Sequence, residues 1–286
     1  MIVVERSNCL PNIRVVDLKA GNFTQYHYIR FQENVYSLHL GPLISHVKYL
    51  TGHRYHSSHC QFIYTSFTQP QQVIDYDLDT RQKTVIHLER LADNYDKSHY
   101  ESKRIFATGH DGTAVPVSLV YRRDLLGIKM IPRQLNPTLL HAYGAYGECV
   151  NPIFSLARIS LLDRGFIFAV AHTRGGSEMG NRWYDEGRLS NKMNTFQDFC
   201  SVAEHLISEG YTQPSKLAIY GRSAGGLLIA AVINFAPQLF QAALTEVPFV
   251  DVITTMSDSS IPWTAFEYEV DLNNTGMGKS CWWRYL

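Results

Sequence analysis

Apolar and polar residues alternate along the first hundred residues with the period of two that is typical of β-strands. Short runs of this kind predict five strands, at residues 13–18, 35–41, 61–67, 72–78 and 83–89. The turn sequence DTRQ predicts a hairpin between the last two, and Met1 leads directly into an apolar run, which predicts that the chain starts inside a sheet. This part is therefore predicted to be all-β, either a sandwich or propeller blades.

From residue 137 the pattern changes to alternating strands and helices, after a hairpin over 104–122 that turns at Asp111 and Gly112. Nearly continuous apolar runs predict four strands, at 138–144, 165–172, 216–221 and 242–249. Helical spacing predicts three helices between them, at 154–165, 195–210 and 224–235. Thr195 is predicted to cap the second helix. Together these elements predict a parallel, doubly wound α/β sheet.

The sequence GRSAG, residues 221–225, matches the pattern G-x-S-x-G and lies between a predicted strand and a predicted helix. A strand that turns sharply into a helix holds the serine in a strained conformation, exposes its hydroxyl and leaves no room for side chains at the glycines. The helix N-terminus offers the backbone N–H of Ala224 to an oxyanion. We therefore predict that Ser223 is a nucleophile, with a glycine-rich packing turn as the alternative. Arg222 is either a substrate contact or a partly exposed structural donor.

Several longer segments resemble the prolyl oligopeptidase family of serine peptidases, and specifically its oligopeptidase B branch: YGRSAGGLL, HTRGGSEMG, LLDRGFIFAVAHTRGG, PFVDVITTMSDSSIP and EYE. The resemblance runs from near residue 4 to Glu269. In that family a β-propeller covers an α/β-hydrolase domain and admits peptides rather than folded proteins. The resemblance implies an α/β protein whose residues 1–95 form the last blades of a partial propeller. Residues 96–286 then form an α/β-hydrolase region with an incomplete parallel sheet and an unrelated ending from about residue 270.

The resemblance also implies roles for single residues. Tyr143, in HAYGAYGE, matches the tyrosine whose hydroxyl joins the N–H of Ala224 in the oxyanion hole. A core tyrosine is the structural alternative, and Tyr146 takes the role if the alignment is shifted. Glu267 and Glu269 match the acidic pair that receives an arginine or lysine side chain of the substrate, unless they are simply solvated.

The chain departs from the family at two places. Where oligopeptidase B has a second acidic pair, this chain has Asn151 and Ile153, so a preference for paired basic residues is not implied. The larger departure concerns the base, because α/β-hydrolases carry serine, acid and histidine in that order. All twelve histidines precede Ser223. We therefore predict that the triad acid and histidine are missing.

Other candidates for the missing groups have structural interpretations. His172 follows a predicted strand and is predicted to be a structural or oxyanion-region residue, and His205 is predicted to be a surface or boundary residue of a helix. Asp251 and Asp258 follow the serine, but an acid without a histidine orients no base. Loss of a triad member lowers turnover by about four to six orders of magnitude. Ser223 is thus predicted to be present and nearly inert.

Three functions fit these observations. The first is a serine oligopeptidase that hydrolyses short peptides after Arg or Lys. The second is a non-catalytic chain that acts by interaction and self-associates through unpaired strand edges. The third is an esterase for small esters, which shares the G-x-S-x-G motif but does not explain EYE or the β-rich first third.

Composition excludes several other classes of protein. The chain has 26 basic and 26 acidic residues, without a block of either sign, so we expect neither nucleic acid nor a membrane surface as a partner. The longest apolar run, 226–236, is far shorter than the roughly 18 residues that a membrane span needs. No signal peptide is evident, so we expect a cytoplasmic protein. Five scattered cysteines without a C-x-x-C pair indicate reduced thiols, and we expect no metal and no cofactor.

Overall fold

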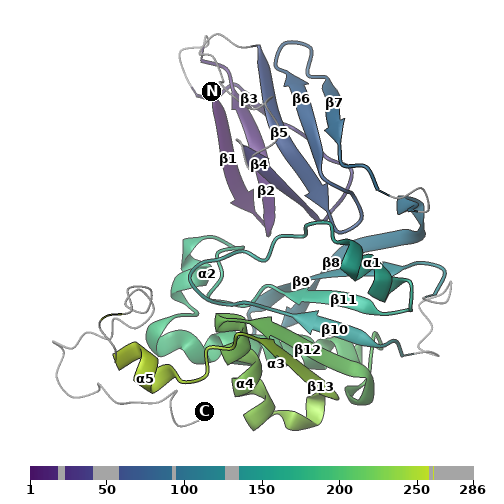
Figure 1. The fold of residues 1–286 in the computed structure, drawn as a ribbon. Coiled ribbons are helices and arrows are strands. Elements are labelled where there is room, and N and C mark those ends of the chain that lie inside the picture. Colours follow the sequence, from purple (N-terminus) through teal and green to yellow (C-terminus); the bar gives the residue numbers. More distant parts are fainter. Residues whose placement is uncertain (19–22, 41–57, 92–94, 126–134, 258–259, 261–286) are drawn as a thin grey trace.

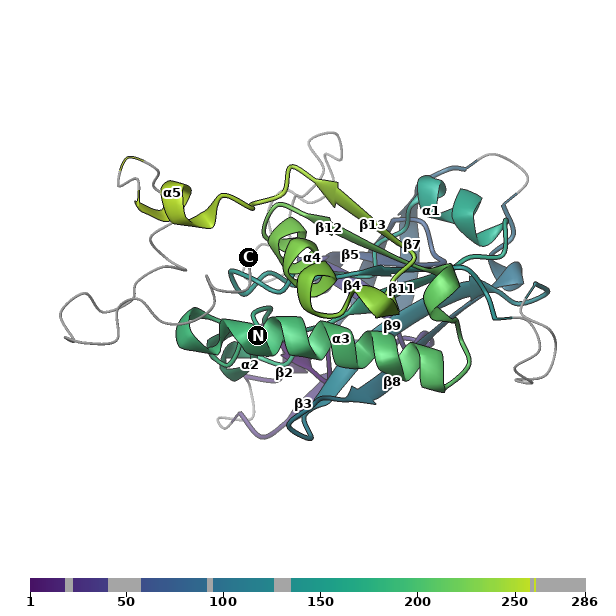
Figure 2. The same ribbon diagram turned by 90° about the horizontal axis from the view of Figure 1, so that it is seen from below.

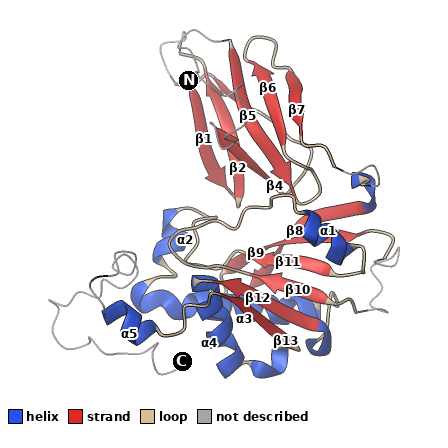
Figure 3. Cartoon of the chain, in the orientation of Figure 1, coloured by secondary structure: helices blue, strands red, loops and turns tan. Residues whose placement is uncertain are grey.

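The computed structural model describes residues 1–18, 23–40, 58–91, 95–125, 135–257 and 260. Figure 1 shows two stacked parts, with a β-rich part above a part in which helices and strands alternate. The described residues before residue 92 form strands and their connections, and the helices of the described chain lie in the second part (Figure 3). The predicted change of pattern along the chain is confirmed.

The first part consists of two antiparallel sheets. The three-stranded sheet contains β1 (Ile2–Ser7), β2 (Leu10–Val16) and β3 (Tyr26–Tyr28). The four-stranded sheet contains β4 (Tyr36–Leu40), β5 (His59–Ser66), β6 (Gln72–Asp77) and β7 (Lys83–Leu88). Alternate residues such as Ile13 and Phe62 are fully buried and meet in one apolar cluster that both sheets share. Each predicted strand of this part is present.

The second part is built on a six-stranded sheet. Its strands are β8 (Tyr100–Thr108), β9 (Ala114–Arg122), β10 (Thr138–His141), β11 (Ile167–Ala171), β12 (Leu217–Arg222) and β13 (Ala242–Glu246). The order across the sheet is β13-β12-β10-β11-β9-β8, and the four strands from β13 to β11 are parallel. β9 runs antiparallel to both β11 and β8, and a tight turn at residues 109–113 reverses the chain between β8 and β9. The sheet is thus mixed rather than wholly parallel.

Helices cover both faces of this sheet. They are α1 (Leu156–Leu162), α2 (Asn181–Asp185), α3 (Lys192–Ser208), α4 (Ala224–Phe235) and α5 (Val252–Ser257). α1 packs Ile159 and Leu162 on one face, whereas α3 and α4 bury apolar side chains against the other. Figure 2 shows α3 and α4 lying across the sheet when it is seen from below. This arrangement leaves the carboxyl ends of β10, β11 and β12 together at one edge of the sheet. In α/β proteins this edge is where ligands bind.

The prediction that Thr195 caps a helix is wrong. A 3₁₀ turn at Leu189–Asn191 leads directly into α3, which therefore begins at Lys192 rather than after Thr195. Thr195 lies in the first turn of the helix and is fully buried, and its hydroxyl donates to the carbonyl oxygens of Arg174 at 2.7 Å and Gly187 at 3.1 Å. The hydroxyl thus anchors a loop to the helix.

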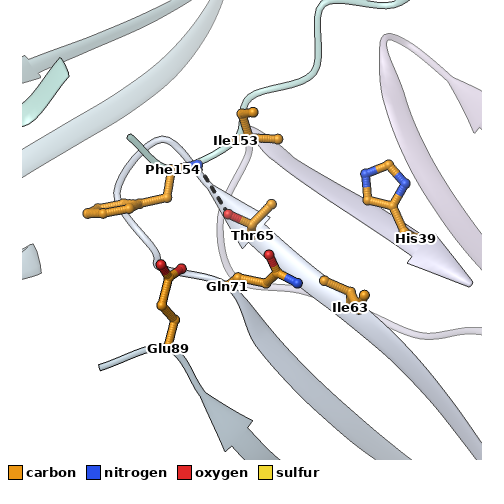
Figure 4. A pocket seen from close by; sticks show the side chains of 7 residues that line it. All are labelled: His39, Ile63, Thr65, Gln71, Glu89, Ile153 and Phe154. Carbon is orange, nitrogen blue, oxygen red and sulfur yellow. Dashed lines mark hydrogen bonds between the residues drawn. The ribbon is translucent and has the colours of Figure 1, made fainter. Parts of the chain in front are cut away.

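The two parts are in contact at several places. The backbone N–H of Phe154 donates to Thr65 Oγ1 at 3.2 Å, and Arg6 Nη2 donates to Asn151 Oδ1 at 3.0 Å. A cavity of about 210 Å³ lies at the same boundary (Figure 4). Its lining residues are His39, Ile63, Thr65, Gln71, Glu89, Ile153 and Phe154. None of these residues belongs to the predicted catalytic group.

Within the described ranges, no helix is both long and apolar enough to cross a membrane.

Candidate active site

Ser223 occupies the junction between β12 and α4. Its backbone has φ 54° and ψ −117°, a left-handed conformation that a residue with a side chain rarely adopts. The Ser223 side chain is exposed, and its hydroxyl makes no capping hydrogen bond to the helix. The predicted sharp turn from strand to helix is therefore confirmed, and it presents the hydroxyl outward.

The glycines around Ser223 are required by close packing. A Cβ atom at Gly221 would lie 2.1 Å from the carbonyl oxygen of Gly225, and a Cβ at Gly225 would lie 2.7 Å from that of Ala142. Gly226 packs against the loop that follows β13, since a Cβ atom added at Gly226 would lie 2.6 Å from Pro248 Cα. Real Cβ atoms do not approach other atoms this closely, so larger residues would displace the turn.

Backbone hydrogen bonds hold the turn at Ser223. The N–H of Ser223 donates to Glu246 O at 2.9 Å, and its carbonyl accepts from Leu227 N at 3.2 Å and Phe249 N at 3.1 Å. Within the described part of the chain, the N–H of Ala224 donates to no backbone carbonyl, as is usual in the first turn of a helix. That N–H lies next to the Ser223 hydroxyl in the chain, where an oxyanion would form.

The structure brings the segment of Tyr143 against this turn. β10 pairs with β12 in parallel, with His141 opposite Tyr220, so residues 142–144 and Ser223 both follow neighbouring strands at the same edge. A Cβ at Gly225 would be 3.4 Å from Tyr143 Cα. Tyr143 is half-buried, and Tyr146, three residues farther along, is exposed. The backbone of Tyr143 therefore lies against the start of α4, and its role as the phenol donor stays a prediction.

Arg222 precedes the serine and points into solvent, with 64% of its side chain exposed. Its Nε lies 3.4 Å from Glu246 Oε1, and the hydroxyl of Tyr220 donates to the other oxygen of that carboxylate at 2.6 Å. The hydrogen bond to Glu246 raises the pKa of Tyr220. Of the two roles considered for Arg222, substrate contact and structural donor, these contacts fit the structural donor.

His172 is buried and already engaged on both sides of its ring. Nε2 lies 2.6 Å from Ser118 Oγ, and Nδ1 lies 3.3 Å from Glu178 Oε1. Burial lowers the pKa of His172, so the ring is neutral near pH 7. His205 belongs to the last turn of α3, which leads back to the start of β12, the end of the strand opposite to Ser223. Neither histidine is arranged to accept a proton from the serine.

Sequence reasoning missed an ion pair beneath this edge of the sheet. Arg174 follows β11 and binds Asp198 of α3 in bidentate fashion, with Nη2 2.6 Å from Oδ1 and Nε 2.9 Å from Oδ2. Arg174 Nη1 also donates to Asp111 at 2.7 Å. Burial raises the pKa of Asp198. The available signal was an aspartate between Phe196 and Phe199, in the apolar stripe of a predicted helix, where an unpaired charge would be costly.

Comparison with known proteins identifies the architecture. The model of the prolyl oligopeptidase family matches residues 152–282. Over 94% of its length, this chain is 40% identical in sequence to dipeptidyl aminopeptidase BI of Pseudoxanthomonas mexicana and covers 35% of that protein. Over the same share of its length it is 37% identical to protease 2 of Moraxella lacunata and covers 36% of that protein. The structure superposes on oligopeptidase B from Leishmania major with a TM-score of 0.81 and 38% identity, over 93% of this chain and 36% of that one.

The chain belongs to the prolyl oligopeptidase family. The two antiparallel sheets of its first part are blades of a partial β-propeller, and the mixed sheet is an α/β-hydrolase sheet, so the predicted fold class is confirmed. The chain spans about a third of the length of the relatives it matches.

Some residues singled out within the family resemblance cannot be placed at the site. Glu267, Glu269 and Asp258 lie outside the described residues. Asp251 lies just before α5, where its side chain accepts a hydrogen bond from Thr254 N at 3.4 Å. Asn151, at the position of the second acidic pair, has its side-chain oxygen occupied by Arg6, as described above. The roles of the glutamates therefore stay predictions.

Proposed function

We propose that this chain carries the nucleophile and oxyanion elements of a serine oligopeptidase that hydrolyses short peptides. The observation that supports this most directly is the exposed Ser223 at positive φ, with the Ala142–Tyr143 backbone packed against the helix start that follows it. We also propose that residues 1–95 form the propeller part of the chain and residues 96–286 the peptidase part. A cytoplasmic location stays a prediction from the sequence.

In the proposed reaction, Ser223 Oγ attacks the carbonyl carbon of the scissile peptide bond. Negative charge then develops on the carbonyl oxygen, and the phenol of Tyr143 and the N–H of Ala224 stabilise it. These donors interact with a charge that the ground state lacks, so they accelerate the reaction rather than only bind the peptide. The hydroxyl must lose its proton as it attacks, and in α/β-hydrolases a histidine takes that proton. Among the described residues, neither His172 nor His205 is arranged to do so, so slow turnover is expected of the described part of the chain alone.

Substrate preference forms a separate part of the proposal. Glu267 and Glu269 supply two carboxylates for an arginine or lysine side chain on the acyl side of the scissile bond. The Arg6 guanidinium at Asn151 disfavours a second basic side chain there, because like charges repel. We therefore propose single rather than paired basic residues as the recognised feature.

Labelling with a fluorophosphonate probe tests the nucleophile. We expect slow attachment at Ser223, none in Ser223→Ala, and at least tenfold slower attachment in Tyr143→Phe, which keeps the ring and removes the oxyanion donor. Hydrolysis of arginine, lysine and leucine amides then tests preference, with the double variant Glu267→Gln and Glu269→Gln as control. Labelling no greater in the wild type than in Ser223→Ala would refute activity of this chain and leave its family membership unchanged.

A second candidate function is interaction through exposed strand edges. All five residues of β13, at the edge of the six-stranded sheet, are exposed, and so are all six of β7. Edge strands with apolar side chains such as Leu244 and Val85 pair readily with strands of other chains. We propose that two copies of this chain associate through these edges.

Sedimentation velocity tests this association. We expect the sedimentation coefficient to increase with protein concentration, and Leu244→Lys to reduce the increase, because a charged edge resists strand pairing. Ile233→Lys, which places the same charge on the exposed part of α4, is the matched control and should have no effect. A monomer at all concentrations would contradict the proposal.

A further inference from the structure

Lys192 is a buried cation in an unfavourable position. It is the first residue of α3, where the positive end of the helix dipole repels it, and only 7% of its surface is exposed. Burying an ammonium group also costs free energy unless it is well bonded. Its Nζ donates to the carbonyl oxygen of Gly144, 48 residues earlier in the chain, at 2.7 Å. This contact offsets part of both costs and ties α3 to the turn that follows β10.

The turn at Gly144 is wedged between other elements. Gly144 has φ 67°, and a Cβ there would lie 2.4 Å from Thr195 Cγ2 and 2.6 Å from Thr173 Oγ1. On the opposite side, a Cβ at Gly175 would lie 2.2 Å from the carbonyl oxygen of Gly144. That oxygen is covered by protein, so without Lys192 it would lose a hydrogen bond that water could not readily replace.

The same turn contacts the nucleophile elbow. Ala142 O and Tyr143 Cα lie against Gly225, as described above, and a Cβ at Gly144 would lie 3.5 Å from Leu228 Cδ1 of α4. A shift of the turn therefore changes where Tyr143 lies relative to Ser223. We propose that Lys192 is a positioning residue, which fixes the Tyr143–Gly144 turn against the start of α4. The catalytic consequence of this contact rests on the function proposed above.

Lys216 provides a matched control. Its Nζ donates to the carbonyl oxygen of Leu135 at 2.7 Å, on the other side of β10, and this contact is exposed. The two lysines thus make the same chemical contact with segments that flank one strand. They differ in burial and in which end of β10 they hold, so Lys216→Met changes a lysine contact without touching the turn at Gly144.

Hydrogen–deuterium exchange on the full chain tests the positioning role. We expect amides of residues 142–147 to exchange at least tenfold faster in Lys192→Met than in the wild type, and unchanged in Lys216→Met. Lys192→Arg, which keeps a cationic donor, should restore part of the protection. If Lys192→Met does not fold, Lys192→Gln carries the same expectation, because its side chain is shorter than that of lysine. Unchanged exchange at 142–147 would overturn the proposal.

Fluorophosphonate labelling of the same variants links the turn to Ser223. We expect the labelling rate to fall at least tenfold in Lys192→Met, to recover partly in Lys192→Arg and to stay unchanged in Lys216→Met. Faster exchange with an unchanged labelling rate would overturn the proposal. If the wild type is not labelled at all, the proposed peptidase activity fails, and the exchange measurement alone decides the positioning role of Lys192.

Discussion

Gly221→Ala provides a direct test of how tightly the strand turns into the helix at Ser223. The added methyl carbon would lie 2.1 Å from the carbonyl oxygen of Gly225, 2.4 Å from its carbonyl carbon and 2.7 Å from Ile229 Cγ1. Ordinary contacts of a Cβ begin near 3.4 Å, so the overlap exceeds 1 Å. Two of the three atoms belong to the backbone of α4 and cannot rotate away.

The expected loss of stability follows from this geometry. Overpacking by a single group costs about 1–3 kcal/mol where side chains can adjust, and more where the backbone must move. We expect Gly221→Ala to lower the free energy of unfolding by at least about 3 kcal/mol. Gly165→Ala is the control, because Gly165 has φ 84° and no atom within 4 Å of its Cβ position. That substitution carries only the backbone penalty, about 1–2 kcal/mol.

Urea unfolding followed by circular dichroism measures both losses under the same conditions. The reasoning requires that Gly221→Ala lose clearly more stability than Gly165→Ala. Equal losses, or an unfolding midpoint of Gly221→Ala close to that of the wild type, would refute the close approach of β12 to α4. They would also remove the physical reason for the glycines of the motif.

Two further predictions concern buried charged and titratable groups. Burial lowers the pKa of His172 and of His141, so below about pH 6.5 the unfolded chain binds protons that the folded chain does not. The free energy of unfolding should therefore decrease below that pH by up to about 1.4 kcal/mol per pH unit for each histidine. Midpoints of urea unfolding that stay the same between pH 7 and pH 5 would contradict this. Asp198→Asn leaves Arg174 without its buried carboxylate partner and should cost about 3–5 kcal/mol in urea unfolding. Asp124→Asn, which breaks an exposed pair, should cost no more than about 1 kcal/mol, and similar losses for the two variants would count against the buried pair.

Local sequence was sufficient for most elements and for the turn that carries Ser223. The helix predicted at 224–235 coincides with α4, because Ala-rich helical spacing begins directly after the glycine motif and Pro237 follows its end. The strand before it was also predicted, because the apolar run is too short for a helix and ends at a glycine. The prediction that Thr195 caps α3 was wrong because a preceding 3₁₀ turn leads into a helix that begins at Lys192, four residues earlier than predicted, and apolar periodicity does not reveal such a turn.

The contacts between distant segments were decided by tertiary structure alone. Arg174 and Asp198 are 24 residues apart, and Lys192 and Gly144 are 48 apart, so no local pattern pairs them. They meet because β10 and β11 lie side by side and α3 packs against β11, β9 and β8, which brings the loops that follow β10 and β11 into contact with the start of the helix. Hydrophobic periodicity was enough to predict most strands and the helices α1, α3 and α4, and the G-x-S-x-G motif was enough to predict the exposed serine. The order of the strands in the sheet then determined which buried polar groups became partners, because a buried charge is stable only beside the group that packing brings to it.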